Sequence, residues 1–498
     1  MDDAGPQVDA GSSTMNDAGF DAGAPDAGLM DAGADDAGVG DAGVDDAGVD
    51  DAGVSDAGSN DAGADDAGID AGPALYVPDP VTMGLNLPPV IPVLQVNVNG
   101  QAIQKDVGIA GTITIYEQHD GTLTDLATRT PTFTGPISFE GRGNFTWTLP
   151  KKGYAFELQD GAGNGVELPI LGLPPGSDFA LYACYTDKTC LRNALVYAVG
   201  QQLGRWSPRT RFVELYIDNQ YLGLYMVWER VRRDGDRVAL PKPAASLAAG
   251  DLTGGYIIRH EGGGKGSGDF TLHSNRVYTF HYPSETSITV DQQGYIVGAF
   301  QQLEDALASN PAVAYANSLD ASWVDRAIIE ELTNNWDGYV HSIYMTKARL
   351  SDGGRFGMGP LWDFDLAFGN GNVTGYNCRT DNWAHRIVRP YPDDVPSYWL
   401  SLFADPTFTR DVKCRWQSLR QGALAQSTFD QRIATWTAFT AAARARDQAK
   451  WMTIGRSIFP NCTSQATYAL EVQWLHDWIA ARLAWLDAQL AVAPGTCP

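Results

Sequence analysis

The chain has 498 residues, of which 44% are hydrophobic, and this suits one large globular domain or two to three ordinary ones. Its formal net charge is −25, but residues 1–72 hold nineteen Asp and no Glu, Lys or Arg, so only six excess negative charges belong to the rest. The body is therefore close to electrically balanced, which excludes the basic footprint of a nucleic-acid-binding protein. No run of eighteen apolar residues occurs, so the sequence predicts no membrane span.

Residues 1–72 form an irregular repeat of Asp-Ala-Gly, as in DAGADDAGVGDAGVDDAGV. Large apolar side chains are nearly absent there, so the segment cannot bury enough surface to offset the entropy of ordering, and we predict a disordered, extended linker. Calcium binding is the alternative. The glycine-rich calcium repeats have a period of about nine residues with a regular apolar position, which this spacing lacks.

The chain opens directly in this repeat, without the charged and apolar regions of a signal peptide. We interpret the opening as the start of a mature or truncated form. An acidic stalk before a globular domain resembles the tethers of bacterial surface lipoproteins. These features predict an extracellular or cell-surface protein, with any lipid anchor upstream of Met1.

The six cysteines include no CxxC pair and no neighbouring histidine cluster, which argues against a zinc site. Their even number suits three disulfides or six buried thiols, and export would favour the disulfides. Cys184 and Cys190 are near enough in sequence to close a short loop.

From Pro73 the texture changes to short β-rich runs broken by Gly, Asn and Pro, followed by a helical pattern over residues 188–204. A hairpin is predicted next, turning at Asp218 and Asn219. Further strands lie within residues 251–290, around a glycine-rich loop at 262–269 that we interpret as a surface turn. We predict an α+β fold in which residues 73–498 form one two-lobed domain, β-rich over about 73–290 and helical over about 291–498.

The helical part carries Trp474, Trp478 and Trp485 at steps of four and seven, which places the three indoles on one helix face. A core-facing stripe is favoured over a carbohydrate-binding platform.

The segment from Phe139 to Leu158, FEGRGNFTWTLPKKGYAFEL, combines a glycine turn with two adjacent lysines. Glycines let backbone approach a ligand closely, and cations gather phosphates. The segment therefore indicates a phosphate-binding hairpin, although basic glycine turns are also common in surface hairpins. Its candidate ligand-binding residues are Gly141, Arg142, Gly143, Asn144, Lys151 and Lys152.

A second segment, NNWDGYVHSIYMTKARLSDGGRFGMGPLWDFDLAFGN, places a carboxylate before a predicted hairpin and a carboxylate pair after it. Asp337 and Asp363 are 26 residues apart, which is long enough for two strands and short enough to return the second acid beside the first. Phosphoryl transfer requires cations for the phosphates, carboxylates for a metal and an acceptor near the attacking hydroxyl. The two segments together supply all three.

These segments, with TDKTCLRNALVYAVGQQLG and FVELYIDNQYLGLYMVWERV, resemble the spore coat protein H (CotH) kinase family over roughly residues 90–400. The resemblance implies an atypical, two-lobed protein-kinase-like fold that uses ATP with Mg²⁺ or Mn²⁺ on Ser or Thr of surface or coat proteins.

Carried over by position, Asp337 resembles the catalytic-loop Asp, and Asp363, with Asp365 as a second candidate, resembles the metal-binding Asp. Lys152, in preference to Lys151, would reach the phosphates. The other residues implied are Arg192 at the entry of a helix, Glu229 at the end of an interlobe strand from Tyr225 that contacts adenine, and Trp362 as a stacking ring. Helix capping by Asp187, turn capping by the two later acids, surface lysines and core packing of Trp362 are the structural alternatives.

One departure concerns the second metal. A kinase places Asn five residues after the catalytic Asp, and this position is Ser342, a poorer ligand. Either His341 or Asn335 compensates, or the site holds one metal, or the protein has weak or no activity. The helix also lacks an obvious Glu partner for the lysine. With these two departures noted, the resemblance still makes an exported protein kinase the leading interpretation. The alternatives are a kinase-fold enzyme that transfers a nucleotide or an amino acid, and a non-catalytic surface or adhesion module.

Overall fold

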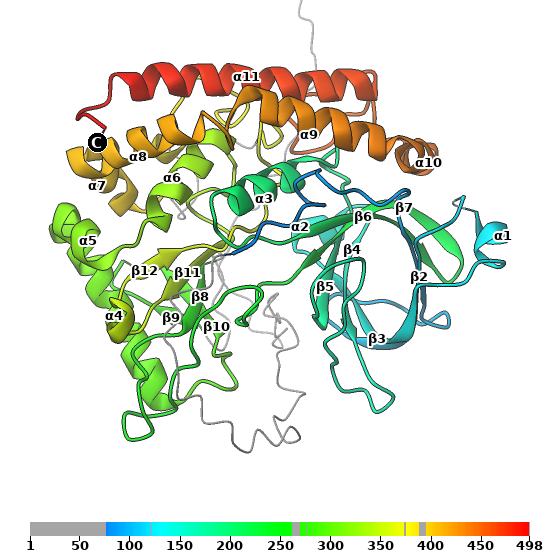
Figure 1. Ribbon diagram of the computed structural model, residues 1–498, viewed down its shortest axis with the longest axis horizontal. Helices are drawn as coiled ribbons and strands as arrows, with labels where there is room; N and C mark the ends of the chain where they lie inside the picture. The colour runs from blue at the N-terminus through cyan, green and yellow to red at the C-terminus, as the bar shows by residue number, and fades with distance from the viewer. Residues whose placement is uncertain are drawn as a thin grey trace, which may run out of the picture. The chain divides into compact units, whose positions relative to one another are not determined.

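The computed structural model describes residues 76–120, 122–260, 269–274, 276–372, 375–387 and 395–497. The Asp-Ala-Gly segment predicted over 1–72 lies outside the described residues, and so does most of the glycine-rich loop. The described chain is a mixed α+β structure built on two sheets and a layer of helices (Figure 1).

The first sheet is a closed seven-stranded barrel of order β1-β2-β3-β4-β5-β7-β6. All neighbours are antiparallel except β1 and β6, whose parallel pairing closes the barrel. Alternate side chains of its strands fill the interior, which buries a cluster of aliphatic and aromatic residues. The strands are β1 (Val93–Asn97), β2 (Ile109–Tyr116), β3 (Phe133–Arg142), β4 (Gly153–Leu158), β5 (Asp178–Tyr182), β6 (Thr210–Ile217) and β7 (Gln220–Glu229).

The predicted hairpin is confirmed between β6 and β7. Asp218 and Asn219 form its two-residue turn with φ of 45° and 64°, as a turn that matches the twist of the flanking strands requires.

The second sheet has five strands in the order β12-β11-β8-β10-β9. It joins strands from before and after residue 290, so the division into a β-rich part to 290 and a helical part from 291 does not follow the sheets. Non-local pairing of β8 with β11 is the physical reason, and the sequence pattern does not reveal it. The strands are β8 (Tyr256–His260), β9 (Asp269–Thr271), β10 (Val277–Tyr282), β11 (Ile343–Lys347) and β12 (Phe356–Met358).

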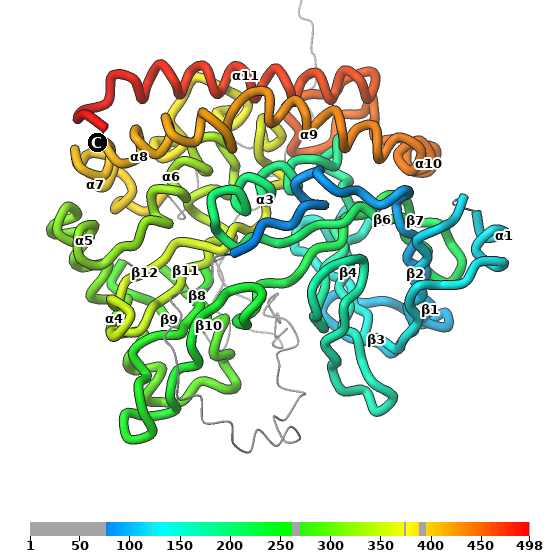
Figure 2. Tube along the Cα trace, viewed as in Figure 1, coloured from blue at the N-terminus to red at the C-terminus, as the bar shows by residue number. Residues whose placement is uncertain are grey.

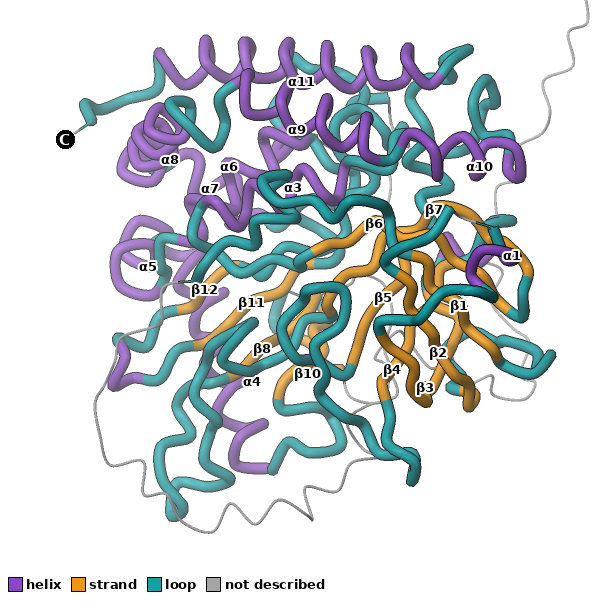
Figure 3. The backbone as a smooth tube through the Cα atoms, turned by 45° about the vertical axis from the view of Figure 1, so that its right-hand side comes forward, coloured by secondary structure: helices purple, strands orange, loops and turns teal. Residues whose placement is uncertain are grey.

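Helices α8, α9, α10 and α11 form a layer along one side of the strands, as Figures 1 and 3 both show. Figure 2 follows the trace from the blue and cyan barrel to the red α11 in this layer. The helices are α1 (Leu123–Leu126), α2 (Phe145–Thr148), α3 (Arg192–Gln202), α4 (Val290–Ser309), α5 (Pro311–Ser318), α6 (Ser322–Thr333), α7 (Ser397–Ala404), α8 (Pro406–Leu419), α9 (Gln426–Phe439), α10 (Ala441–Trp451) and α11 (Tyr468–Ala491), with short 3₁₀ turns at η2 (Leu350–Asp352) and η3 (Ala384–Arg386).

Helix α3 is the helix predicted within residues 188–204, but it is buried on all sides rather than on one face, since residues 192–201 are all buried. The indole stripe of α11 does face the core: Trp478 is 3% exposed, and Trp474 and Trp485 pack against the same cluster. Within the described residues, no helix has the length and apolar character needed to cross a membrane.

The six cysteines form three disulfides, which decides between the two alternatives left by the sequence. Cys184 pairs with Cys190, Cys378 with Cys462, and Cys414 with Cys497. The last two tie the C-terminal helical layer together and anchor the loop before α11.

Candidate active site

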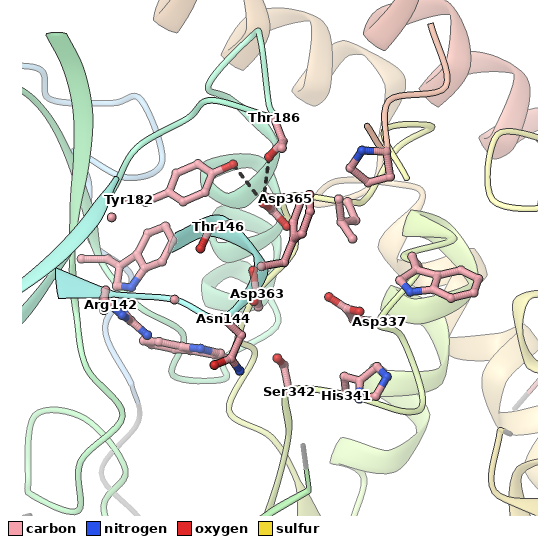
Figure 4. Close-up of a pocket in the computed structure, with 18 of the residues that line it drawn as sticks. Arg142, Asn144, Thr146, Tyr182, Thr186, Asp337, His341, Ser342, Asp363 and Asp365 are labelled. Atoms are coloured by element: carbon pink, nitrogen blue, oxygen red, sulfur yellow. Dashed lines mark hydrogen bonds between the residues drawn. The ribbon is translucent and has the colours of Figure 1, made fainter. Parts of the chain in front are cut away.

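A cavity of about 410 Å³ collects residues from seven separate stretches of the chain (Figure 4). They come from the turn after β3, from the start of β4, from β5 and the disulfide loop behind it, from the end of β7, from the loop after α6, from the loop after β12, and from the loop before α11. The lining residues are Arg142, Gly143, Asn144, Phe145, Thr146, Gly153, Leu181, Tyr182, Thr186, Trp228, Trp336, Asp337, His341, Ser342, Trp362, Asp363, Asp365, Leu366, Phe459 and Pro460.

The turn after β3 is the predicted glycine turn, and Arg142, Gly143 and Asn144 all line the cavity. Gly143 has φ of +100°, a conformation that other residues rarely adopt. Gly141 does not line the cavity. A Cβ there would collide with the indole of Trp147, so this glycine allows the short helix α2 to fold back onto β3.

Asp365 is buried at 6% exposure and accepts hydrogen bonds on Oδ2 from the hydroxyls of Tyr182, at 3.3 Å, and Thr186, at 3.2 Å. Burial, with the charges of Asp363 and Asp187 nearby, raises the pKa of the Asp365 carboxyl well above its usual value. Burial and the neighbouring carboxyl groups therefore disfavour the ionised form of Asp365.

The backbone of Asp363 adopts φ of +60° and is held on both sides. Its N–H donates to the Tyr197 hydroxyl at 3.1 Å, and its carbonyl accepts from Asn335 Nδ2 at 3.0 Å. The next amide, of Phe364, donates to Asn193 Oδ1 at 2.7 Å. Helix α3 and the loop after α6 therefore fix the carboxylate pair in place.

Asp337 begins a tight loop in which the amides of Val340 and His341 donate to its carbonyl at 3.0 and 2.8 Å. Tyr339 and Ser342 have φ of 67° and 53°, and the Tyr339 hydroxyl donates to buried Glu331 at 3.0 Å. Figure 4 shows Asp337, His341 and Ser342 together on one wall, facing Asp363 and Asp365.

The two lysines do not line the cavity, and the structure does not bring them to the phosphate position predicted for them. Lys151 is 1% exposed, and its ammonium donates to the Leu224 carbonyl at 2.6 Å and to Asp447 at 2.7 Å. Lys152 donates to the Trp147 carbonyl and lies 5.1 Å above that indole. The physical reason is local, because both ammonium groups already have acceptors that lie away from the cavity.

Arg192 and Glu229 also lie outside the lining. Arg192 is 2% exposed and pairs with Asp187 at 2.6 Å, and Asp187 in turn accepts the Arg192 amide at 2.9 Å. The N-cap of α3 is Leu191, so the alternative of Asp187 as the N-cap is wrong; the Asp187 carboxylate instead accepts the amide of the first helical residue from the preceding loop. Glu229 forms a buried ion pair with Arg209 at 2.5 Å, so its carboxylate has a structural partner at the end of β7.

Trp362 does line the cavity, with the Arg142 guanidinium 5.5 Å above its ring. It is 8% exposed and packs edge-on against Trp228. Trp362 therefore both packs against a neighbouring indole and lines the cavity.

The oxygen ligands of the cavity suit a hard divalent cation such as Mg²⁺ or Mn²⁺. Asp363 and Asp365 would supply the carboxylate oxygens, and a bound cation would favour the ionised form of Asp365 that burial disfavours. Among the described residues, no group of three or more acidic, His or Cys side chains could hold a metal. A Mg²⁺ ion in this cavity would therefore have to take one or two carboxylates and complete its shell with water and substrate phosphates.

Of the two suggested supplements to Ser342, His341 lines the cavity and Asn335 does not. The Asn335 amide donates to the Asp363 carbonyl, and its Oδ1 is buried with no hydrogen-bond partner in the described part of the chain. Asn335 therefore orients Asp363.

Several lining residues were not predicted. Thr186 lies inside a motif that the sequence singled out, so its hydroxyl could have been considered there. Phe145 directly follows the glycine turn. Phe459 and Pro460 carry no sequence signal, since only the fold brings the loop before α11 to the cavity.

A family model described as CotH kinase protein matches residues 139–486, well over half of the chain. The match begins in the glycine-turn segment and extends through most of α11. No curated protein matches the chain.

Proposed function

The chain belongs to the CotH kinase family, and from this we propose that it binds ATP with Mg²⁺ or Mn²⁺ in the cavity and transfers the γ-phosphoryl group to a Ser or Thr hydroxyl of a protein. The observation that supports the proposal is that the two predicted segments, distant in sequence, line the same cavity. Arg142 to Asn144 and the acids Asp337, Asp363 and Asp365 are about two hundred residues apart in sequence, and they line one cavity.

The chemistry assigned to each residue follows from its type and surroundings. Asp337 would accept the proton of the attacking hydroxyl as the oxygen bonds to the γ-phosphorus, while the bond to the β-phosphate oxygen breaks and ADP leaves. Asp363 and Asp365 would hold the metal, whose positive charge neutralises the phosphates. Of the described side chains that line the cavity, Arg142 is the one guanidinium or ammonium group, so we assign phosphate binding to it in place of the lysines.

We further propose the kinase-like division of labour. The barrel would act as the lobe that presents the glycine turn, and the loops after α6 and β12 would belong to the lobe that carries the acids. The closed barrel and the sheet shared across residue 290 are features of this chain that such a comparison must accommodate.

An extracellular or cell-surface location is part of the proposal, with a surface or coat protein as the substrate. Three disulfides support it, because such bonds persist in oxidising compartments.

The test is transfer of label from ATP labelled on the γ-phosphate to a Ser- and Thr-rich protein with Mg²⁺ or Mn²⁺ present. Asp337→Asn and Asp363→Asn should each reduce the initial rate by roughly 10²-fold or more. Asn tolerates the left-handed backbone of residue 363, so this variant keeps the loop. Asp352→Asn, an exposed Asp outside the cavity lining, is the matched control.

Equal labelling by wild type and Asp363→Asn would refute the proposal. Label transferred from the α-phosphate would assign the fold to nucleotide transfer instead. A chain that ATP and metal fail to stabilise in a thermal melt would be a non-catalytic surface module.

A further inference from the structure

Two of the three exposed large aromatic side chains of the described chain line the cavity. Among the described residues, three large aromatic side chains are exposed: Phe145 at 46%, Tyr376 at 48% and Phe459 at 62%. Phe145 and Phe459 both line the cavity. Burial of an aromatic ring is strongly favourable, so two open rings beside a polar cavity call for a ligand that covers them.

The two rings are far apart in the sequence but lie in contact in the folded chain. Phe145 begins α2, directly after Asn144 of the glycine turn. Phe459 belongs to the loop that the Cys378–Cys462 disulfide anchors, and Asn461 in that loop donates to the Thr186 carbonyl at 2.8 Å. The ring centroids are 5.8 Å apart at 80°. An edge-on pair of this kind leaves most of the ring faces open.

The other aromatic side chains that line the cavity pack against one another or against Arg142. Tyr182 stacks on Trp228 at 5.2 Å, Trp362 meets Trp228 edge-on at 5.8 Å, and the Arg142 guanidinium covers Trp362. Trp228 is 4% exposed and Trp362 is 8% exposed.

The side chains from Tyr225 to Glu229, the part of β7 expected to contact adenine, are buried as well. Tyr225, Met226 and Val227 of β7 are fully buried, and Glu229 is paired with Arg209. A planar base therefore finds no open face on β7 or on the paired indoles.

We infer that Phe145 and Phe459 form the surface on which the nucleotide base stacks. The inference rests on the proposed function and specifies how its nucleotide is held. Arg142 and a metal ion held by Asp363 and Asp365 would attract the phosphates, and the uncharged planar base would lie against the open rings of Phe145 and Phe459. Stacking on aromatic faces tolerates any base, so this surface would recognise nucleoside triphosphates as a class, with little discrimination among bases.

The test compares two ligands that differ only in the presence of the nucleoside, Mg-ATP and Mg-tripolyphosphate, by calorimetry. The variant Phe145→Leu/Phe459→Leu keeps apolar volume but removes both rings. It should weaken ATP binding at least about fivefold and leave tripolyphosphate binding unchanged. Phe145→Tyr/Phe459→Tyr should retain ATP affinity, and Tyr376→Leu is the matched control for an exposed ring outside the cavity.

Equal ATP affinity of the Leu variant and the wild type would overturn the inference while the proposed function stands. An equal loss of ATP and tripolyphosphate would overturn it too, because the rings would then act through the glycine turn. A raised KM for the protein acceptor with unchanged ATP affinity would assign the rings to the acceptor. If the wild type binds neither ligand, the proposed function itself fails and the inference with it.

Discussion

Lys151 distinguishes a structural from a catalytic interpretation of the glycine-turn segment. Its buried ammonium contacts the Leu224 carbonyl and Asp447, and Asp447 also accepts the Leu224 amide at 2.9 Å. One lysine and one aspartate thus connect the start of β4 to β7 and α10. Lys151→Met would leave a largely buried carboxylate and a carbonyl without their donor.

Removing one partner of a buried ion pair costs about 3–5 kcal/mol of unfolding free energy. An unfolding entropy of about 2.1 cal/mol/K per residue, over roughly 400 residues, converts this loss into a fall in Tm of about 4–6 °C. Lys152→Met should cost less, about 1–2 kcal/mol, because it removes a half-buried cation above an indole and one hydrogen bond.

Differential scanning calorimetry and ATP titration of both variants provide the assay. Lys151→Met should melt earlier and, below its melting temperature, bind Mg-ATP with wild-type affinity. The double variant Lys151→Met/Asp447→Leu should regain part of the lost stability, since replacing both charges by apolar groups removes the unpaired carboxylate. A Lys151→Met protein with unchanged Tm but no ATP binding would refute the structural role of Lys151 and would show that this lysine binds the phosphates.

Three further predictions follow from single contacts. Gly143→Ala should lower the unfolding free energy by about 1–3 kcal/mol in urea titration and weaken ATP binding, because φ of +100° strains any L side chain; an unchanged urea midpoint would contradict this. Burial beside Arg259 and Arg230 lowers the pKa of His281 to about 4, so the unfolded chain binds a proton near pH 6.5 that the folded chain refuses. Stability should therefore fall by up to about 3 kcal/mol as the pH drops from about 6.5 to about 4, and urea unfolding of His281→Gln should show a smaller loss over that range. Chelation of divalent metal by EDTA should abolish ATP-dependent stabilisation in a thermal melt, whereas stabilisation that survives EDTA would remove the role given to Asp363 and Asp365.

Local patterns in the sequence predicted local structure well. The Asp218–Asn219 turn, the helix at residues 192–202 and the return of Asp363 to the cavity that Asp337 lines all depend on short spacings, and the structure has each of them. The even number of cysteines left three disulfides and six buried thiols open. Short spacing suggested the Cys184–Cys190 loop, which the structure has, but it did not suggest the other two pairings.

Long-range contacts were beyond the sequence. The barrel closes by a parallel pairing of β1 with β6, more than a hundred residues apart, and no pattern in either strand specifies that partner. Adjacent lysines 151 and 152 look equivalent in sequence, and only the position of Asp447 decides where the first ammonium goes. Phe459 reaches the cavity because a disulfide and Asn461 hold its loop there.

The spread of the cavity along the chain has a consequence for folding. Its residues extend from Arg142 to Pro460, and the contacts that fix its surroundings join partners as far apart as Thr186 and Asn461, 275 residues, and Lys151 and Asp447, 296 residues. Contacts between distant segments form late, because the entropy of closing long loops is lost before they can form. We expect that a chain still being synthesised has no complete cavity until the loop before α11 has emerged, so that nucleotide binding marks a finished molecule and truncated chains do not compete for ATP.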